Sequence, residues 1–510
     1  MKLSPKGKRI LWVTLGSIAV LAIVGGWFAW EKFFRQEPQV FANEAEQFKY
    51  GSLGAEGERG IPYFIWLVMP RLFNDLLPGA GGWRSFGIVW EEGAEMPVGF
   101  SKKRVGFDRV TNNCAVCHTA TYRLTEEEAP KVAVAAPSHT TNLQQVLRFM
   151  FKAAHDPRFN SETIMNEIRL VSGDQYGNGG LSFLDRQIYR FVLIPFTKKA
   201  LLEQEKQFTW MEKFIEDGTP KPDWGPGRDD AMNLTKYFMT KQTVDNSVGP
   251  TDFPSIWNLG IRSGKDNAGK QMLLNWTGDT PAVRSVLIDS AMGLGAPPRP
   301  WFLQRMADLD KYLSNLPPPA WPFGETHPIN PQIADAGKAL YMRDCASCHE
   351  PRAEWTNKVV PIAEIDTDFE RTKSWSKAAA EEANRKVKAM GIDRPPMTEL
   401  DPYGYLSPPL DGIWLRAPYL HNGSVPTLRD LLNVPEERPV TFHRGYDVFD
   451  PVKVGWKEPE LRKIGPYGQP HDPFFLFDTR SRGEGNGGHL YGTALTTDEK
   501  EALVEYLKTL

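Results

Sequence analysis

Two motifs of the form Cys-x-x-Cys-His use every cysteine in the chain. They are Cys114, Cys117 and His118 in "NCAVCHTA", and Cys345, Cys348 and His349 in "DCASCHEPRA". Two thiols and an imidazole at this spacing can bind a metal ion, cycle between dithiol and disulfide, or hold a covalent cofactor. The distance between the motifs and the histidine within each one separate these three chemistries.

The separation of the motifs argues against a shared zinc site. Zinc ribbons place their cysteine pairs about 15–20 residues apart, whereas Cys117 and Cys345 are 228 positions apart. A thioredoxin-like redox pair gives the histidine no role and is expected in a βαβ setting. Covalent c-type haem uses both thiols as thioethers and the adjacent histidine as the iron ligand. The sequence therefore predicts two covalently bound haem c groups, with His118 and His349 as iron ligands.

Helices are predicted around both motifs. The segment "PQIADAGKALYMRDCASCH" (331–349) has apolar residues at helical spacing and predicts a helix that leads into Cys345. The segment "TTDEKEALVEYLKTL" (496–510) opens with a capping box and predicts a closing helix. A similar closing helix is predicted over 301–319, where prolines end it. We therefore predict a mainly α fold with two cytochrome c-like haem domains and long loops.

A basic and then apolar N-terminus precedes the first motif. Lys2, Lys6, Lys8 and Arg9 come before an uncharged run from Ile10 to Trp30. As a helix this run is roughly 31 Å long, enough to cross a bilayer core. Because basic flanks stay in the cytoplasm, we predict a single-pass inner-membrane protein with its haem domains in the periplasm. A cleaved signal peptide is the alternative, although "GGWFAWEKFF" offers a poor cleavage site.

The helices and loops suggest a division of the chain into three parts. These are a cytoplasmic tip and transmembrane anchor (1–40), an enlarged N-terminal haem c domain (41–322) and a C-terminal cytochrome c domain (328–510). Gly- and Pro-rich tracts at 173–180, 218–227 and 293–300 predict long loops, and 369–391 predicts a charged, solvated helix. A formal net charge of −3 gives no basic field that would attract nucleic acid, so no nucleic-acid partner is expected.

One stretch after the second motif resembles a known family. "RAPYLHNGSVPTLRDLL" (416–432) is similar to a segment of the bacterial dihaem cytochrome c peroxidases and the related dihaem rubber oxygenases. Two later runs, "PEERPVTFHRGYDVFDPVKVGW" and "GNGGHLYGT", resemble the rubber-oxygenase-like branch more closely. The resemblance extends from residue 228 onward, is thinner over 41–227 apart from the haem motif, and is absent from the membrane anchor.

The resemblance has consequences for the second haem. In the peroxidase branch this haem takes a methionine just after the shared segment, but "DLLNVPEERP" contains none. The rubber-oxygenase-like pattern implies a histidine ligand instead, and we select His489, whose flanking glycines let the backbone approach the macrocycle. His443 is the second choice, and Met390 and Met397 are further alternatives.

For the first haem, "LNWTGDT" (274–280) resembles the peroxidase segment whose tryptophan lies between the two haems. Trp276 is therefore the candidate electron-relay residue, with core packing as the alternative because the chain has 16 tryptophans. The peroxidases also carry a distal acid farther along, where this chain has Asp289. His139 would instead fill the sixth position and close the site. Arg228 in "GPGRDDAMN" is a candidate partner of a haem propionate.

Two functions agree with these features. A haem iron with an open position binds O₂ or H₂O₂, whereas an iron with two protein ligands transfers electrons. The resemblance implies an oxidoreductase with peroxidase- or dioxygenase-like chemistry at the His118 haem, supplied with electrons through the His349 haem. The alternative is an electron carrier with both haems six-coordinate. The expected partners are a redox protein or quinone-linked donor and the membrane, and the anchor argues against an insoluble extracellular polymer as substrate.

Overall fold

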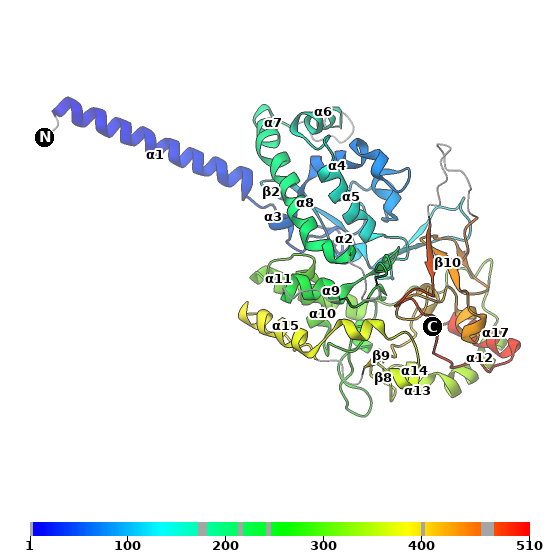
Figure 1. Cartoon of the computed structure of the whole chain (residues 1–510). Coiled ribbons are helices and arrows are strands. Elements are labelled where there is room, and N and C mark those ends of the chain that lie inside the picture. The colour runs from blue at the N-terminus through cyan, green and yellow to red at the C-terminus, as the bar shows by residue number, and fades with distance from the viewer. Residues whose placement is uncertain (1–3, 172–180, 213–217, 241–245, 399–402, 461–473) are drawn as a thin grey trace.

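The computed structural model describes residues 4–171, 181–212, 218–240, 246–398, 403–460 and 474–510. Helix α1 (Pro5–Phe33) projects from a body that contains the other labelled elements (Figure 1). None of its 29 residues is buried, and at about 1.5 Å per residue it is longer than a bilayer core of ~30 Å. It extends the apolar run predicted over 10–30, because Ser4 caps it and Pro5 occupies its first turn. By length and composition, α1 is a candidate membrane span.

The body is mainly helical, and most of its helices are short. After α1 they are α2 (Glu44–Tyr50), α3 (Glu56–Arg59), α4 (Tyr63–Leu72), α5 (Leu143–His155), α6 (Ser161–Val171), α7 (Phe183–Ile188), α8 (Ile194–Phe208), α9 (Ala231–Thr235), α10 (Val283–Gly293), α11 (Pro300–Asn315), α12 (Pro331–Asp344), α13 (Ala346–His349), α14 (Ile362–Ile365), α15 (Lys377–Ala389), α16 (Leu428–Leu431) and α17 (Thr497–Leu507).

The strands are short and pair locally. The largest sheet among the described residues is antiparallel, with the order β1-β3-β2, and the others are two-stranded. The strands are β1 (Ile61–Pro62), β2 (Phe100–Val105), β3 (Phe107–Asn112), β4 (Thr119–Tyr122), β5 (Lys131–Val134), β6 (Arg228–Asp229), β7 (Thr251–Asp252), β8 (Val359–Pro361), β9 (Gly404–Leu406), β10 (Thr441–Arg444), β11 (Phe449–Asp450), β12 (Gly455–Trp456) and β13 (Phe475–Asp478).

Two helices frame the second motif. Helix α12 leads into Cys345 and crosses the closing helix α17 at Gly337, where a Cβ atom would lie 1.8 Å from the carbonyl oxygen of Ala502. Only glycine allows this close approach. Tyr341 packs on Tyr506, with ring centroids 5.1 Å apart. The predicted capping box at the start of α17 is present, and the closing helix therefore anchors the helix that leads into the motif.

The first motif has a related frame with a long insertion. Phe48 on α2 packs against Tyr312 on α11, with ring centroids 6.1 Å apart, and Arg305 donates to the Gln47 carbonyl at 2.8 Å. Helix α11 is the closing helix predicted over 301–319, and it ends at Asn315, before the prolines. Between α2 and the first motif, residues 51–113 add the sheet β1-β3-β2 and helix α4.

Two helical regions differ from the sequence-based expectation. Helices α7 and α8 are joined by a π turn over Tyr189–Leu193 and form one continuous helix that was not predicted. The charged segment over 369–391 forms a 3₁₀ turn (Glu370–Ser374) followed by α15. One face of α15 is buried rather than solvated, because its alanines pack against Trp375.

The parts of the chain that carry the two motifs share one hydrophobic core. A single cluster includes Phe48 and Tyr122 from before residue 322 and Trp414 from after residue 328. Trp414 contacts Tyr122 and Phe323 edge-on, at centroid distances of 5.3 and 6.0 Å. The core therefore crosses the boundary predicted at 322–328, and the position of that boundary stays a prediction.

Candidate functional site

The first motif lies on a short 3₁₀ helix over Cys114–Val116 that is capped by Asn113. The Asn113 side chain accepts a hydrogen bond from Ala115 N at 2.9 Å and donates to the carbonyls of Lys49 and Gly51 at the end of α2. Burial raises the pKa of Cys114 to about 11. The thiol is therefore protonated at neutral pH when no metal is bound.

Two observations weigh against zinc and against a disulfide. Within the described ranges, no group of three or more His, Cys, Asp or Glu side chains could hold a metal ion. All four cysteines are free, and burial also raises the pKa of Cys345, to about 12. Four protonated thiols, each pair followed by a histidine, fit covalent attachment of haem c better than either alternative.

Each motif histidine is oriented by a proline carbonyl. His118 Nδ1 lies 2.9 Å from the Pro254 carbonyl oxygen, and His349 Nδ1 lies 2.7 Å from that of Pro408. The imidazole is the donor in both bonds, so the proton is on Nδ1 and the lone pair of Nε2 is available to a metal. Burial lowers the pKa of both rings, that of His118 to about 4, and keeps them neutral. Each histidine can therefore bind a metal ion, such as haem iron, through its Nε2 lone pair.

The two prolines begin equivalent turns. Four residues after each, the backbone has a positive φ, 51° at Asn258 and 66° at Gly412, and a 3₁₀ turn follows (Leu259–Ile261 and Ile413–Leu415). The amides of Asn258 and Gly412 donate to the carbonyls of Leu316 and Leu510, just beyond the closing helices α11 and α17. The segment that orients each motif histidine is therefore fixed to the closing helix of the same half.

An arginine eight residues after each proline completes this repeat. Arg262 donates to the Ser255 carbonyl at 3.0 Å, and Arg416 donates to the equivalent Pro409 carbonyl at 2.8 Å. Both guanidinium groups also bond Asp411 Oδ1, at 2.9 and 2.7 Å. Burial, followed by the charge of Arg262, lowers the pKa of Arg416 to about 9. One carboxylate thus joins the two histidine-orienting segments.

Trp276 also lies between these segments. Its indole Nε1 donates to the Asp252 carbonyl at 2.9 Å, and its own carbonyl accepts from Leu406 N at 2.9 Å. Asp252 is two residues before Pro254, and Leu406 is two residues before Pro408. Trp276 is therefore hydrogen-bonded to the supports of both motif histidines, and its role as an electron relay stays a prediction.

His489 faces the second motif. Its ring centroid is 6.3 Å from that of His349, a separation that two metal–nitrogen bonds of about 2 Å each and the two ring radii can span. His489 Nδ1 is buried and has no hydrogen-bond partner in the described part of the chain, and burial lowers the pKa of the ring to about 3. The glycine before His489, Gly488, allows a close approach to protein backbone, because a Cβ atom there would lie 2.3 Å from the Asp366 carbonyl. His489 is thus close enough to share one iron with His349.

The surroundings of His118 differ. The ring in contact with it is Phe253, at a centroid distance of 6.3 Å, which cannot ligate a metal. In the part of the chain that the structure describes, no histidine makes such a ring contact with His118. His139 follows Ser138, whose amide bonds the Cys117 carbonyl at 2.9 Å, but its ring stacks on Trp456 at 3.5 Å. The predicted alternative ligand therefore lies against Trp456 rather than against His118.

Two predicted site residues, Arg228 and Asp289, form ion pairs with protein side chains. Arg228 is fully buried, and its two terminal nitrogens bond the Glu484 carboxylate, each at 2.5 Å, where a haem propionate was expected. Asp289 bonds Arg394 Nε at 2.9 Å, and burial raises its pKa to about 7. The structure ties both residues into ion pairs, and their roles toward haem stay predictions.

The other ligand candidates are elsewhere. His443 Nδ1 bonds Glu458 Oε1. Met397 is buried in a small cluster with Trp375, and Met390 is 48% exposed at the end of α15. These positions leave His489 as the candidate that faces His349.

Arg371 was missed by the sequence analysis, which placed it in a solvated segment. It is 4% exposed, and its Nε and Nη1 have no hydrogen-bond partner among the described residues. The hydroxyl of Tyr405 is also buried without a partner, and Tyr405 stacks on His421 at 3.8 Å. The charge of Arg371 acts on the nearby carboxyl groups of Asp229, Asp230 and Asp279. Its unbonded nitrogens and the Tyr405 hydroxyl could in addition bond an anionic ligand such as a haem propionate.

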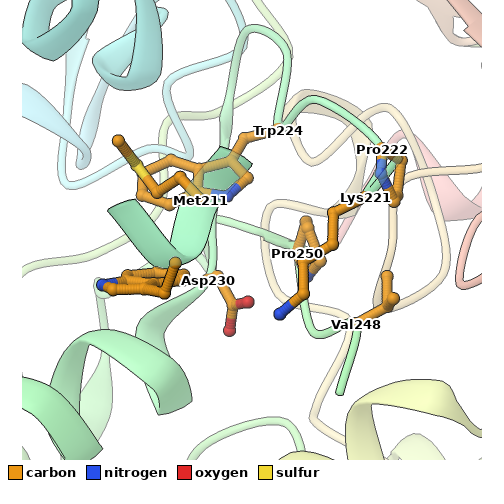
Figure 2. Close-up of a pocket in the computed structure, with 8 residues that line it drawn as sticks. Met211, Lys221, Pro222, Trp224, Asp230, Val248 and Pro250 are labelled. Atoms are coloured by element: carbon orange, nitrogen blue, oxygen red, sulfur yellow. The ribbon is translucent and has the colours of Figure 1, made fainter. Parts of the chain in front are cut away.

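The residues that line the pocket shown in Figure 2 do not include Arg371 or Tyr405. Trp210, Met211 and Trp224 are its large apolar lining residues, and Asp230 and Lys221 also line it (Figure 2). Asp230 caps α9 and Lys221 donates to the Ser247 carbonyl at 3.0 Å, so both already have partners. None of its lining residues belongs to the two motifs, and we assign it no chemistry.

Comparison with known proteins agrees with the geometry around the second motif. Residues 334–406 match a family model described as cytochrome c, and residues 404–443 match one described as RoxA-like, cytochrome c-like. "Uncharacterized protein y4iJ" of Sinorhizobium fredii (strain NBRC 101917 / NGR234) is 26% identical, over 83% of this chain and 84% of its own.

A second protein of the same strain is similar over a shorter length. "Uncharacterized protein y4iM" is 31% identical over 51% of this chain and 64% of its own length. The family matches cover the second Cys-x-x-Cys-His motif, His349 included, and the segment that carries Pro408. The chain thus contains a cytochrome c domain with covalently bound haem c, and it is a c-type cytochrome related to the RoxA-like proteins.

Proposed function

We propose that the chain is a membrane-anchored dihaem cytochrome c whose haem domains lie in the periplasm. The second Cys-x-x-Cys-His motif matches the cytochrome c family, and the first repeats its support from proline carbonyl to closing helix. This repetition supports a second haem c at Cys114, Cys117 and His118. Helix α1, with lysines and an arginine at its start, supports the anchor.

The two sites have different roles in this proposal. An iron with two protein ligands transfers electrons, and one with a free position can also bind O₂ or H₂O₂. The observation that carries the proposal is the contrast between the motif histidines, since His489 faces His349 and Phe253 contacts His118. We therefore assign electron relay to the second site and oxidoreductase chemistry to the first.

The surrounding residues would orient the iron ligands and neutralise the charge of the haem propionates. The Pro254 and Pro408 carbonyls hold the motif histidines in the Nδ1–H tautomer. Trp276 joins the two supports and is the proposed electron path. The guanidinium of Arg371 would pair with a propionate. These residues fix positions and charge.

Asp289 would distinguish peroxide from O₂ as the oxidant. Cleavage of peroxide needs a proton donor, and burial raises the pKa of Asp289 to about 7, so that part of the population carries a proton near neutral pH although Arg394 bonds the same carboxyl group. Replacing Asp289 with Asn would lower a peroxide-dependent rate and leave an O₂-dependent one unchanged. The electron donor in either case is a redox protein or a quinone-linked enzyme.

Mass spectrometry and spectroscopy of the purified chain test the proposal. We expect the added mass of two haem groups, one low-spin and one high-spin ferric signal by electron paramagnetic resonance, and CO binding by one reduced haem. Two low-spin signals with no CO binding would favour the alternative, an electron carrier with both haems six-coordinate. A mass increase of fewer than two haem groups would refute the dihaem assignment.

A further inference from the structure

A row of large apolar side chains is exposed along α7, the π turn and α8. Phe183, Leu184, Phe191, Val192 and Phe196 are 71%, 47%, 69%, 44% and 70% exposed. We call these five residues the α7–α8 apolar face. Single exposed apolar residues are common, but several large ones on one helix are typical of a surface that contacts a membrane or another protein.

The end of the candidate membrane span lies directly beside this helix. Lys32 Nζ bonds Asp185 Oδ1 on α7 at 2.6 Å. Phe33, the last residue of α1, packs edge-on against Phe107, which packs against Tyr189 of the π turn. Figure 1 shows α7 on the side of the body from which α1 projects.

The connection between α1 and the body is short and hydrogen-bonded. Arg35 accepts from Gly106 N at 2.8 Å, and Gln36 forms a β-bridge with Val105. These contacts begin two residues after α1 ends, so no long flexible linker separates α1 from the body. The orientation of α1 across a membrane therefore sets the orientation of α7 and α8.

Charge on the same helix suits a lipid surface. Arg186, Arg190 and Lys199 are exposed, and the Arg190 guanidinium lies 5.7 Å from the centre of the Phe191 ring. Interfacial helices combine aromatic and leucine side chains with basic residues that contact anionic headgroups. A bilayer matches both the apolar and the basic groups of this helix.

We propose that the α7–α8 apolar face is inserted in the interface of the same bilayer that α1 crosses. This inference rests on the membrane anchoring proposed above. The contact is a second attachment point, and it holds the two Cys-x-x-Cys-His sites in one orientation relative to the membrane. The ligand is the phospholipid bilayer, with anionic headgroups contacting the basic residues.

Fluorescence of labelled full-length protein in liposomes tests the proposal. We would replace Phe191 with Cys, attach an environment-sensitive dye, and reconstitute the chain in vesicles of phosphatidylcholine and phosphatidylglycerol. The matched control carries the dye at Lys388→Cys, an exposed position on α15. The unsubstituted chain measures any labelling of the four native cysteines. Lipids with a nitroxide near the headgroup should quench the dye at position 191 and leave the dye at position 388 unquenched.

The outcomes separate this inference from the anchor itself. Quenching at position 191 that is lost when Phe183 and Phe196 are both replaced by Asp would support the interface. An unquenched dye at 191 in a chain that resists carbonate extraction would overturn it, and so would a dye shielded from water but not quenched by lipid, which would indicate a protein partner. Extraction of the unsubstituted chain by carbonate would refute the anchor and, with it, the interface.

Discussion

His489 has a strained backbone that its neighbours stabilise. A φ of 47° costs a non-glycine residue about 1–3 kcal/mol. Arg438 donates to the carbonyls of Asn486 and Gly488 at 2.6 and 2.9 Å, and His489 N donates to Ile365 at 2.8 Å. Strain held by several buried bonds is typical of a functional position, and here it directs an imidazole toward His349.

Replacing His489 with Ala should open the second haem. We expect loss of a low-spin ferric signal and a gain of one equivalent of CO binding in the reduced protein, because His349 would be left as the only protein ligand. The matched control is His443→Ala, which removes a histidine that bonds Glu458. Unchanged spectra in H489A, or the same change in H443A, would contradict the assignment.

Replacing Arg371 with Gln should lower the midpoint potential of one haem. Removing a buried positive charge stabilises the more positive ferric state, and we expect a decrease on the order of tens of millivolts, since about 59 mV is a tenfold change in a one-electron equilibrium. A redox titration followed by visible spectra measures it. Arg480→Gln, which removes an exposed arginine bonded to Asp478, should leave both potentials unchanged.

Asp229 gives a pH-dependent prediction. Burial, and then the neighbouring Asp230, raises its pKa to about 7 from an ordinary value of 3.8. A carboxyl whose pKa is higher in the folded state favours folding in its protonated form, so its contribution to stability is lost as pH rises from about 4 through 7. Asp229→Asn cannot ionise, and its melting temperature should therefore rise relative to that of the unsubstituted chain across this range.

The control for Asp229 has the opposite shift. Hydrogen bonds from the guanidinium and the backbone amide of Arg480 lower the pKa of the partly exposed Asp478 to about 2, so Asp478 stays ionised across the same pH window. The difference in melting temperature between Asp478→Asn and the unsubstituted chain should be constant from pH 5 to pH 8. A constant difference for Asp229→Asn as well would show that its carboxyl is ionised throughout.

At the scale of elements, the two proline-led turns are the repeated unit. Gly412 has a φ of 66°, and a Cβ atom there would lie 2.6 Å from Pro318 Cβ and 2.7 Å from the Trp257 ring. Gly412→Ala should lower the free energy of unfolding by about 1–3 kcal/mol, through strain and crowding. Gly293→Ala, at the end of α10 with nothing within 4 Å, should be neutral or stabilising. Denaturant titrations followed by circular dichroism compare the two, and equal midpoints would refute the strain.

Local signals predicted the elements that depend on local interactions. The capping box at Thr496 predicted the start of α17, and helical spacing predicted α12, because caps and amphipathic faces are set within one or two turns. The bond from His118 to the Pro254 carbonyl was not predictable. Its partners are 136 residues apart, and a backbone acceptor leaves no mark in the sequence.

Long-range burial explains the other differences. Arg371 was placed in a solvated segment because the sequence alone does not show whether an arginine is buried. The fold shows that Arg371 is 4% exposed. His489 was selected through resemblance to a family and through its flanking glycines, and neither signal shows that its ring faces His349. The helix over 183–208 was missed because a π turn breaks its helical period.

At the scale of the whole molecule, the shared core and the shared carboxylate of Asp411 hold the two motif-bearing halves together. The segments with Pro254 and Pro408 are therefore fixed relative to one another. A relay between two redox centres needs such a fixed separation, because small movements change the rate of electron transfer. If both motifs hold haem as proposed, Trp276, which is bonded to both segments, would lie on the path between the two centres.

Replacing Trp276 with Phe should slow electron transfer between the haems. The phenyl ring keeps the apolar packing but removes the indole bond to the Asp252 carbonyl. We expect the rate of oxidation of the second haem, after O₂ or peroxide reacts at the first, to fall by about tenfold, equivalent to about 1.4 kcal/mol in the barrier. The control is Trp321→Phe, which removes a similar indole bond to the His327 carbonyl in the shared core. Stopped-flow spectra resolve the two haems. A slower electron-transfer step in W276F but not in W321F, with unchanged resting spectra, would assign the relay to Trp276. Equal electron-transfer rates in the two variants would indicate that Trp276 serves in packing.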